Sequence, residues 1–364
     1  MPSATLLAAA LVMMAGPAAP VPHCAPAAAP AEEAAAEAAP VPLPIKTNRS
    51  PPADALYRPP VDVEADPPAF YAKTHYRERG LARTAGGWDA DARGWVASFR
   101  KYQAEQALRP TRDRHTVYLC PLGRMTYRMR KRTRQVREFL QVYLTLPVAM
   151  LEPAPVNGRP VRTVIVGGRA VRQYEAADLK EHVLVPRLRP DALAMMGITA
   201  EDLYSTQVDW DCVGNLTATG RGLAVCSLAR LFPEFHHAAP TARAERRGLD
   251  LAFRMVADAG VGMLGPTPCR KYYCIMNQAK YTSMREPLHL CPDCLRKLRW
   301  SLGFDLIRRY QALRRFYCRL GMMDEARWVL ERLKACVPAA EAARTAPPGT
   351  ADEAAKESAG VPDG

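Results

Sequence analysis

Apolar residues fall into short runs and helical stripes from about residue 115 onward. The runs at 116–120 and 192–199 have the length of strands. Residues 161–171 predict a hairpin that turns at Gly167 and Gly168. Apolar positions at three- and four-residue spacing follow a basic run and predict an amphipathic helix; they are Val136, Phe139, Leu140 and Tyr143. This stretch therefore predicts a folded domain that contains both strands and helices.

Helical spacing returns near the C-terminus. Residues 295–313 predict two amphipathic helices hinged at Gly303, and residues 324–336 predict one more. The leucines of the pair are expected to face inward and its arginines outward; these leucines are Leu298, Leu302, Leu306 and Leu313. Residues 91–108 predict a helix with an apolar face made of Trp95, Phe99 and Tyr102.

Composition divides the chain into four parts. Residues 1–65 are rich in Ala and Pro and predict a disordered leader, and residues 66–113 predict a helical N-terminal extension. Residues 114–336 form the predicted domain, and residues 337–364 a disordered tail. The apolar run at 6–15 is too short for a membrane span and lacks the positive flank of a signal sequence. An intracellular location, cytoplasm or nucleus, is therefore favoured over secretion.

The formal net charge of +13 permits attraction to acidic partners without identifying one. The basic run before the helix includes Arg130, Lys131 and Arg132. It is interpreted as the solvated face of that helix, because few aromatic residues are interleaved for base stacking. A nucleic-acid-binding surface is the less favoured alternative, so nucleic acid is not the expected partner.

Two cysteine pairs lie a short loop apart. Cys269 and Cys274 form the first pair, and Cys291 and Cys294 form a Cys-Pro-Asp-Cys knuckle. Four soft ligands in a tetrahedron are what a structural zinc ion requires. Disulfides are the alternative, and the scattered spacing of the other six cysteines disfavours them. The sequence thus predicts a four-cysteine zinc site.

The spacing of these cysteines resembles the signature of the archaemetzincins, a family of zinc metallopeptidases. In that family a structural zinc site directly follows the catalytic helix HExxHxxGxxH, and Met276 resembles the methionine of the Met-turn beneath the active site. Further similar strings lie at 197–204, 222–230 and 303–313. The resemblance implies a metzincin-like α/β fold: a mixed twisted sheet, covering helices, and a C-terminal helical subdomain on the four-cysteine zinc.

The family register also locates the catalytic positions, and most are substituted. Counting back from Cys269, the first histidine falls on Asp258, the general-base glutamate on Ala259, the second histidine on Gly262 and the third on Pro268; the motif glycine is kept as Gly265. Metzincin catalysis needs three imidazoles on zinc and a carboxylate that accepts a proton from water. The catalytic zinc is therefore expected to be absent, with one structural ion remaining.

Two structural expectations follow from the same segment. Asp250 and the glycines Gly260, Gly262 and Gly265 are poor helix formers, so the second half of the former catalytic helix is predicted to be short or frayed. Residues 222–230 are similar to the family's edge strand, which in active relatives lines the substrate cleft. An extended peptide could still add to such an edge.

Three functional hypotheses remain open. The first is a pseudoenzyme that binds peptide or protein without cutting it. The second is an active zinc metalloprotease or aminopeptidase with rearranged ligands, which would recruit His236, His237 or His289 together with Asp258. The third is a basic, zinc-stapled module that binds nucleic acid. A sequence does not identify the substrate, the partner or the oligomeric state.

Overall fold

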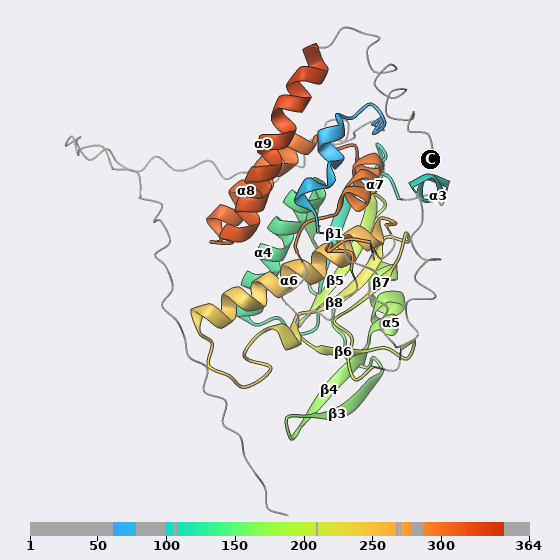
Figure 1. The fold of residues 1–364 in the computed structure, drawn as a ribbon. Coiled ribbons are helices and arrows are strands. Elements are labelled where there is room, and N and C mark those ends of the chain that lie inside the picture. The colour runs from blue at the N-terminus through green and yellow to red at the C-terminus, as the bar shows by residue number, and fades with distance from the viewer. Residues whose placement is uncertain are drawn as a thin grey trace, which may run out of the picture. The chain divides into compact units, whose positions relative to one another are not determined.

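Both apolar runs predicted as strands, at 116–120 and 192–199, are strands of the central sheet, and they pair in parallel. The computed structural model has a five-stranded sheet in the order β2-β1-β5-β8-β7. Its strands are β1 (Thr116–Leu122), β2 (Val148–Met150), β5 (Ala192–Thr199), β7 (Asn215–Ala218) and β8 (Leu223–Ser227). All neighbours are parallel except β7, which runs antiparallel to β8 (Figure 1).

The structure describes residues 61–77, 99–104, 108–208, 210–266, 269, 271–277 and 287–345. All of these lie in one compact unit, Ser50–Gly364. Nearly all of the predicted leader, most of the helix expected at 91–108, and the tail beyond residue 345 lie outside the described residues. Within that helix, α3 (Phe99–Ala104) is described.

The sheet is covered on both faces, and β5 shows this in its burial. All eight of its residues are buried. Met196 and Ile198 join the larger apolar cluster, whereas Met195 joins the smaller one, because successive side chains of a strand point to opposite faces. The larger cluster includes α4 (Tyr127–Leu144) and α6 (Ala242–Met263), and the smaller includes α5 (Ala176–Leu179). The mixed α/β architecture is thus confirmed.

Helices α4 and α6 meet through stacked aromatic rings. The ring centroids of Phe139 and Phe253 are 4.6 Å apart. The basic run forms the first half of α4, and Arg130 and Lys131 are exposed as expected. Arg132 departs from that expectation: it is buried and donates to both carboxylate oxygens of Glu245 on α6. One arginine of the run therefore joins two helices and is not part of the solvated face.

A second, three-stranded sheet has the order β3-β4-β6. It comprises β3 (Val161–Val166), β4 (Arg169–Glu175) and β6 (Asp202–Tyr204). The predicted hairpin is confirmed, with φ of +56° at Gly167 and +78° at Gly168. Two consecutive positive φ angles are the requirement of a type I′ turn, which glycine meets without strain.

Helix α6 contradicts the expectation of a short or frayed second half. It is unbroken through Met263, and Leu264 is its C-cap. Residues 255–263 are buried with the exception of Asp258, so packing against α4 and the sheet outweighs the weak helix propensity of Gly260 and Gly262. Tertiary burial therefore preserves this helix without any need for a metal ligand.

The assignment of residues 222–230 to the sheet edge is also wrong. The strand they contain, β8, lies between β5 and β7. One edge of the sheet is the antiparallel strand β7 (Asn215–Ala218), whose four residues are all half-buried. The resemblance points to β8, which is the more apolar of the two strands. Strand β8 is apolar because it lies in the interior of the sheet.

Three helices complete the C-terminal part: α7 (Pro292–Leu302), α8 (Leu306–Arg319) and α9 (Met323–Thr345). Gly303 forms the predicted hinge with φ of +63°, and the four predicted leucines are all buried. Helix α9 continues to Thr345 through Pro338, so the start of the predicted disordered tail is helical. Ala339 and Ala340 follow this proline, and their high helix propensity offsets part of its cost.

The N-terminal segment 61–77 is tied to these helices by buried arginines. The guanidinium of Arg332 on α9 is fully buried and donates to the carbonyls of Ala69 and Phe70 at 3.0 and 2.9 Å. Arg299 on α7 forms an ion pair with Asp66 at 2.5 Å. Among the described residues, no helix combines the length and apolar character needed to cross a bilayer.

Gly248→Ala is expected to lower the free energy of unfolding by about 1–3 kcal/mol, as overpacking does. A Cβ at this position would lie 2.5 Å from the Phe232 ring and 2.7 Å from the backbone oxygen of Leu231. Gly260→Ala in the same helix is the matched control, because its Cβ would meet only side-chain methyls, that of Leu140 at 3.2 Å and those of Leu144 at 3.5 and 3.9 Å. Urea denaturation should show the control within about 1 kcal/mol of the parent; equal effects would contradict this packing.

Candidate metal centre

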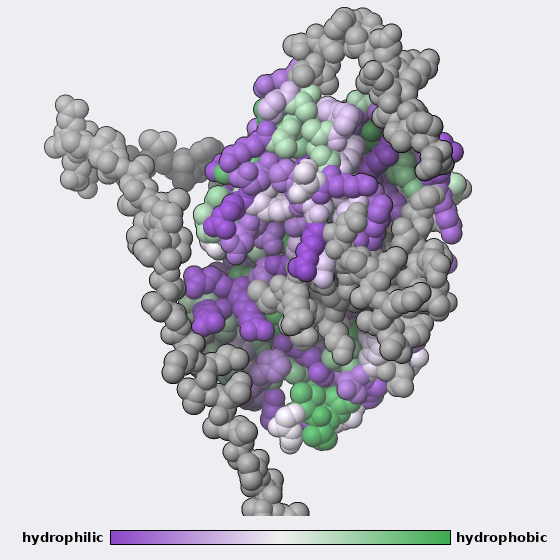
Figure 2. All heavy atoms as spheres, viewed as in Figure 1, coloured by the Kyte–Doolittle hydropathy of each residue, from purple (hydrophilic) through white to green (hydrophobic). Residues whose placement is uncertain are grey.

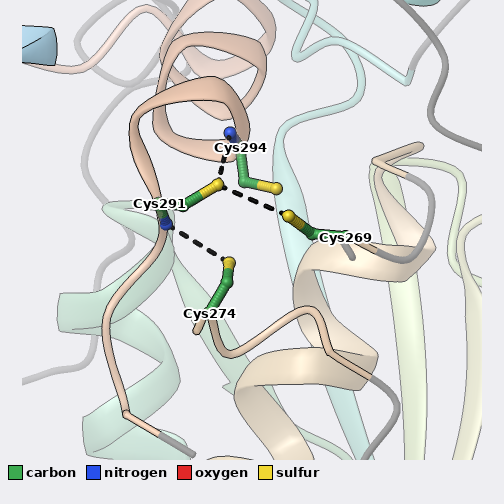
Figure 3. Close-up of side chains that lie close together, drawn as sticks. All are labelled: Cys269, Cys274, Cys291 and Cys294. Atoms are coloured by element: carbon green, nitrogen blue, oxygen red, sulfur yellow. Dashed lines mark hydrogen bonds between the residues drawn. The ribbon is translucent and has the colours of Figure 1, made fainter. Parts of the chain in front are cut away.

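The four predicted cysteines come together between the end of α6 and the start of α7. Cys269 and Cys274 belong to the loop that follows α6, whereas Cys291 is the N-cap of α7 and Cys294 lies in its first turn. Figure 3 shows the four thiols gathered in one small region. All four side chains are buried.

The distances between the sulfur atoms fit one tetrahedral ion. All four Sγ atoms lie within 4.8 Å of one another, and those of Cys269 and Cys291 are 3.6 Å apart. Zinc–thiolate bonds of about 2.3 Å place the sulfurs of a tetrahedron about 3.8 Å apart. A disulfide requires about 2.05 Å, and the four cysteines are free thiols. The geometry therefore favours a metal centre over the disulfide alternative.

Backbone donors also point at the sulfurs. The N–H of Cys291 donates to Sγ of Cys274 at 3.2 Å, and that of Cys294 donates to Sγ of Cys291 at 3.5 Å. Pro292 occupies the first turn of α7, where its missing N–H costs nothing. The helix N-terminus and the N–H donors both stabilise negative charge on sulfur, as a thiolate ligand requires.

Electrostatics oppose the ionisation of all four thiols in the absence of a cation. Hydrogen bonds from the other three thiols lower the pKa of Cys269, whereas burial raises the pKa of Cys274. Hydrogen bonding within the group, led by that with Cys269, raises the pKa of Cys294. One sulfur thus takes the negative charge at the expense of its neighbours. A divalent ion would remove this conflict, because it deprotonates each thiol that it coordinates.

The cysteine loop is held by its own hydrogen bonds. Asn277 is buried, accepts from the N–H of Cys274 at 3.0 Å, and donates to the carbonyl of Cys269. The N–H of Cys269 donates to the carbonyl of Met276 at 2.9 Å. Met276 itself is buried in the main core. Sequence reasoning missed Asn277, because its burial and its two backbone partners are visible only in the folded loop.

The N-terminal segment 61–77, hereafter the strap, contacts the same loop. The N–H of Tyr273 donates to the carbonyl of Arg77 at 2.9 Å, and the Tyr76 ring packs edge-on against Tyr272 and His289. On the opposite side, the Tyr143 hydroxyl of α4 donates to the carbonyl of Leu288 at 3.0 Å. The metal centre thus lies where the strap, α4 and the C-terminal helices converge.

The residues that the family resemblance aligns with the catalytic motif lie on and just beyond α6. Asp258 is half-buried near β8, since its carboxylate, together with the larger effect of burial, raises the pKa of Cys226. Ala259 and Gly262 are buried, and Gly265 follows the helix with φ of +121°. Pro268 lies outside the described residues.

The β7–β8 turn closes over the position of the second histidine. The N–H of Gly220 donates to the carbonyl of Gly262 at 3.2 Å, and that of Gly222 donates to the carbonyl of Met263 at 3.1 Å. A Cβ on Gly262 would lie 3.3 Å from the Thr217 methyl of β7. The end of α6 is therefore sealed by the edge hairpin of the sheet.

The three histidines considered as replacement ligands do not meet Asp258 in a metal-binding group. His236 and His237 are exposed, and His236 contacts the carbonyl of Arg230 at 2.9 Å. His289 stacks on Trp328 with centroids 3.8 Å apart, and burial lowers its pKa to about 3. In the part of the chain that is described, the four cysteines are the one group of three or more ligands close enough to share an ion.

Cys294→Ser should abolish metal retention and lower the free energy of unfolding by several kcal/mol. The reason is that structural zinc binding, on the order of 10 kcal/mol in zinc-finger peptides, contributes directly to folding. Cys318→Ser is the control, because Cys318 is exposed on α8. Elemental analysis and thermal unfolding of both purified variants check the prediction, and equal metal content in the two would refute it.

Comparison with known proteins gives a consistent result. No family model matches the chain. It is 34% identical over 149 residues to archaemetzincin-1 of Homo sapiens, an alignment that covers 34% of this chain and 30% of the relative. It is 26% identical over 244 residues to archaemetzincin-2 of Macaca fascicularis, covering 57% and 65%. The chain thus spans less than two thirds of the length of either relative.

Two solved structures are also similar. One is a zinc-dependent peptidase from Methanocorpusculum labreanum, at 21% identity with a TM-score of 0.39, covering 50% of this chain and 99% of the other. The second is archaemetzincin from Methanopyrus kandleri, at 18% identity with a TM-score of 0.40, covering 52% and 96%. By sequence the chain is therefore similar to archaemetzincins, and its structure contains a cluster of four cysteines that could hold a metal ion.

Proposed function

We propose that this chain is a catalytically impaired archaemetzincin that keeps one structural zinc ion in its four-cysteine site and binds peptide without cutting it. The closure of α6 by the β7–β8 turn carries the proposal. Where the second catalytic histidine would stand, Gly262 lies against Thr217 and its carbonyl accepts from Gly220. An imidazole at this position would need the edge hairpin to move.

Among the described residues, those around this position supply no replacement chemistry. Ala259 has no group that accepts a proton from water, and Gly262 has no side-chain ligand. Asp258 offers a carboxylate, but one oxygen ligand does not build the three-ligand open site of a catalytic zinc. The proposal therefore assigns Asp258, Ala259, Gly262, Gly265 and Pro268 to a degenerate motif.

The four-cysteine centre has a structural role in this proposal. Cys269, Cys274, Cys291 and Cys294 would hold zinc, and the ion would supply folding free energy through a closed tetrahedral site. A closed site has no position for a water molecule, so it supplies no nucleophile. Its buried cysteines join the end of α6 to the start of α7.

Peptide binding would use β7. Among the described strands, β7 has a partner on one side, β8, and its four residues are all half-buried. An extended peptide can add to such an edge through backbone hydrogen bonds alone. This binding requires no catalytic residue, so it survives the loss of the motif.

The purified chain should contain one zinc ion and should not hydrolyse unstructured peptides, with or without a chelator. An archaemetzincin with an intact HExxHxxGxxH motif provides the positive control. Elemental analysis and mass spectrometry of the peptide mixture are the measurements. A second tightly held ion, or turnover that stops on chelation, would sink the proposal.

Peptide addition should slow hydrogen exchange of the backbone amides in β7 while leaving the opposite sheet edge, β2, unchanged. The reason is that a peptide strand would pair with outward-facing N–H groups of β7. Exchange with and without a mixture of unstructured peptides measures the effect. Equal exchange in both conditions would count against peptide binding at this edge.

A further inference from the structure

The β3–β4 hairpin presents an exposed apolar edge that the proposed function does not use. Ile165 is 71% exposed and Val161 is 42% exposed, on a strand that pairs with β4 alone among the described strands. Figure 2 shows the corresponding hydrophobic patch at the bottom of the view, where Figure 1 places this hairpin. Soluble proteins usually protect such edges with charge, bulges or covering segments.

A hydrogen bond at the start of β3 shows which of its residues direct their backbone groups toward β4. The carbonyl of Pro160 accepts from the N–H of Glu175 at 3.2 Å, so even-numbered residues of the strand direct their backbone groups toward β4. Val161, Thr163 and Ile165 therefore direct their N–H and C=O groups toward the outer edge. The same three residues carry the exposed side chains of the strand.

The one charged residue of β3 does not guard this edge. The Arg162 guanidinium turns across the sheet face, where it donates to Gln173 at 2.7 Å and to the carbonyls of Trp210 and Asp211 at 3.1 and 2.9 Å. The Arg162 side chain is thus engaged by contacts within the chain and does not extend over the outer edge. The open edge keeps a flat row of Val, Thr and Ile.

We propose that β3 pairs antiparallel with β3 of a second copy of this chain, joining the two three-stranded sheets into one. In such a pair, the odd-numbered residues of one strand must lie opposite odd-numbered residues of the other, because these carry the outward-facing backbone groups. The register centred on Thr163 places Val161 opposite Ile165 of the partner at two symmetric positions, and Thr163 opposite Thr163 of the partner. Apolar pairs and Thr–Thr pairs are both favourable across strands.

Charge selects this register over its neighbour. A shift of the centre to Arg162 would place two guanidinium groups directly opposite each other, which is destabilising. In the register centred on Thr163, Arg162 faces Val164 of the partner. Pro160, which lacks an N–H, falls at an inward-facing position where the partner needs no donor. The sequence of β3 is therefore self-complementary in apolar pattern, charge and backbone donors.

Cross-linking tests the register directly. In a Cys318→Ser background, Thr163→Cys should form a covalent dimer under mild oxidation, because hydrogen-bonded antiparallel pairs lie about 5.5 Å apart at Cα, within disulfide reach. Ile165→Cys is the matched control, since the two copies of residue 165 would be about 13 Å apart along the strands. Equal cross-linking of both variants, or of neither, would overturn the proposed register.

Sedimentation velocity of the full zinc-loaded chain tests association without cysteines. The parent should shift from monomer toward dimer across about a hundredfold range of concentration. Ile165→Lys should weaken the dimer at least about tenfold, since it places a charge in the paired edge. Met323→Lys, a substitution of another exposed apolar residue, should leave it unchanged. A parent that stays monomeric throughout, or an equal effect of both substitutions, would refute the proposal.

Discussion

Four thiols buried in one small space are the constraint on which the C-terminal half depends. Hydrogen bonds from the other thiols lower the pKa of Cys269, whereas burial raises the pKa of Cys274, so one sulfur takes negative charge that its neighbours do not share without a cation. The two cysteine pairs lie on separate segments, the loop after α6 and the knuckle that begins α7. A bound ion would crosslink these two segments. Buried contacts of the strap and α4 with the loop then orient this subdomain.

In the proposed function, α6 is a catalytic helix that has become a structural one. A histidine or glutamate on an active-site helix must keep its surface open to substrate and water. In this proposal Ala259 and Gly262 stand in their place, so the same surface is small and apolar, and the β7–β8 turn can approach it. Backbone N–H groups of Gly220 and Gly222 then satisfy the last helical carbonyls, which a helix end requires when it is buried. The packing that results holds the helix without metal.

Local patterns predicted what depends on local chemistry. The cysteine spacing identified the metal centre, and the paired glycines at 167–168 identified the hairpin, because thiol ligation and positive φ leave marks in the sequence. Strand order leaves no such mark. The similarity to the family's edge strand falls on β8, which is interior, whereas the strand at the edge, β7, has only four residues. The buried guanidinium of Arg332 was likewise invisible, since its partners are backbone carbonyls more than 260 positions away in sequence.

The edge strands β7 and β3 differ in how strongly the fold protects them, and this difference separates their proposed roles. Strand β7 has four half-buried residues, and Thr217 already contacts α6, so an added strand would find a shaped and partly covered site. Strand β3 projects from the main sheet with Ile165 mostly exposed, and nothing in the described part of the chain covers its outer side. A recessed edge selects among extended peptides, because side chains on the recessed face limit what fits beside it. A projecting and self-complementary edge favours pairing with the same edge of a second copy, because the two flat strands can meet there without obstruction from the rest of either copy.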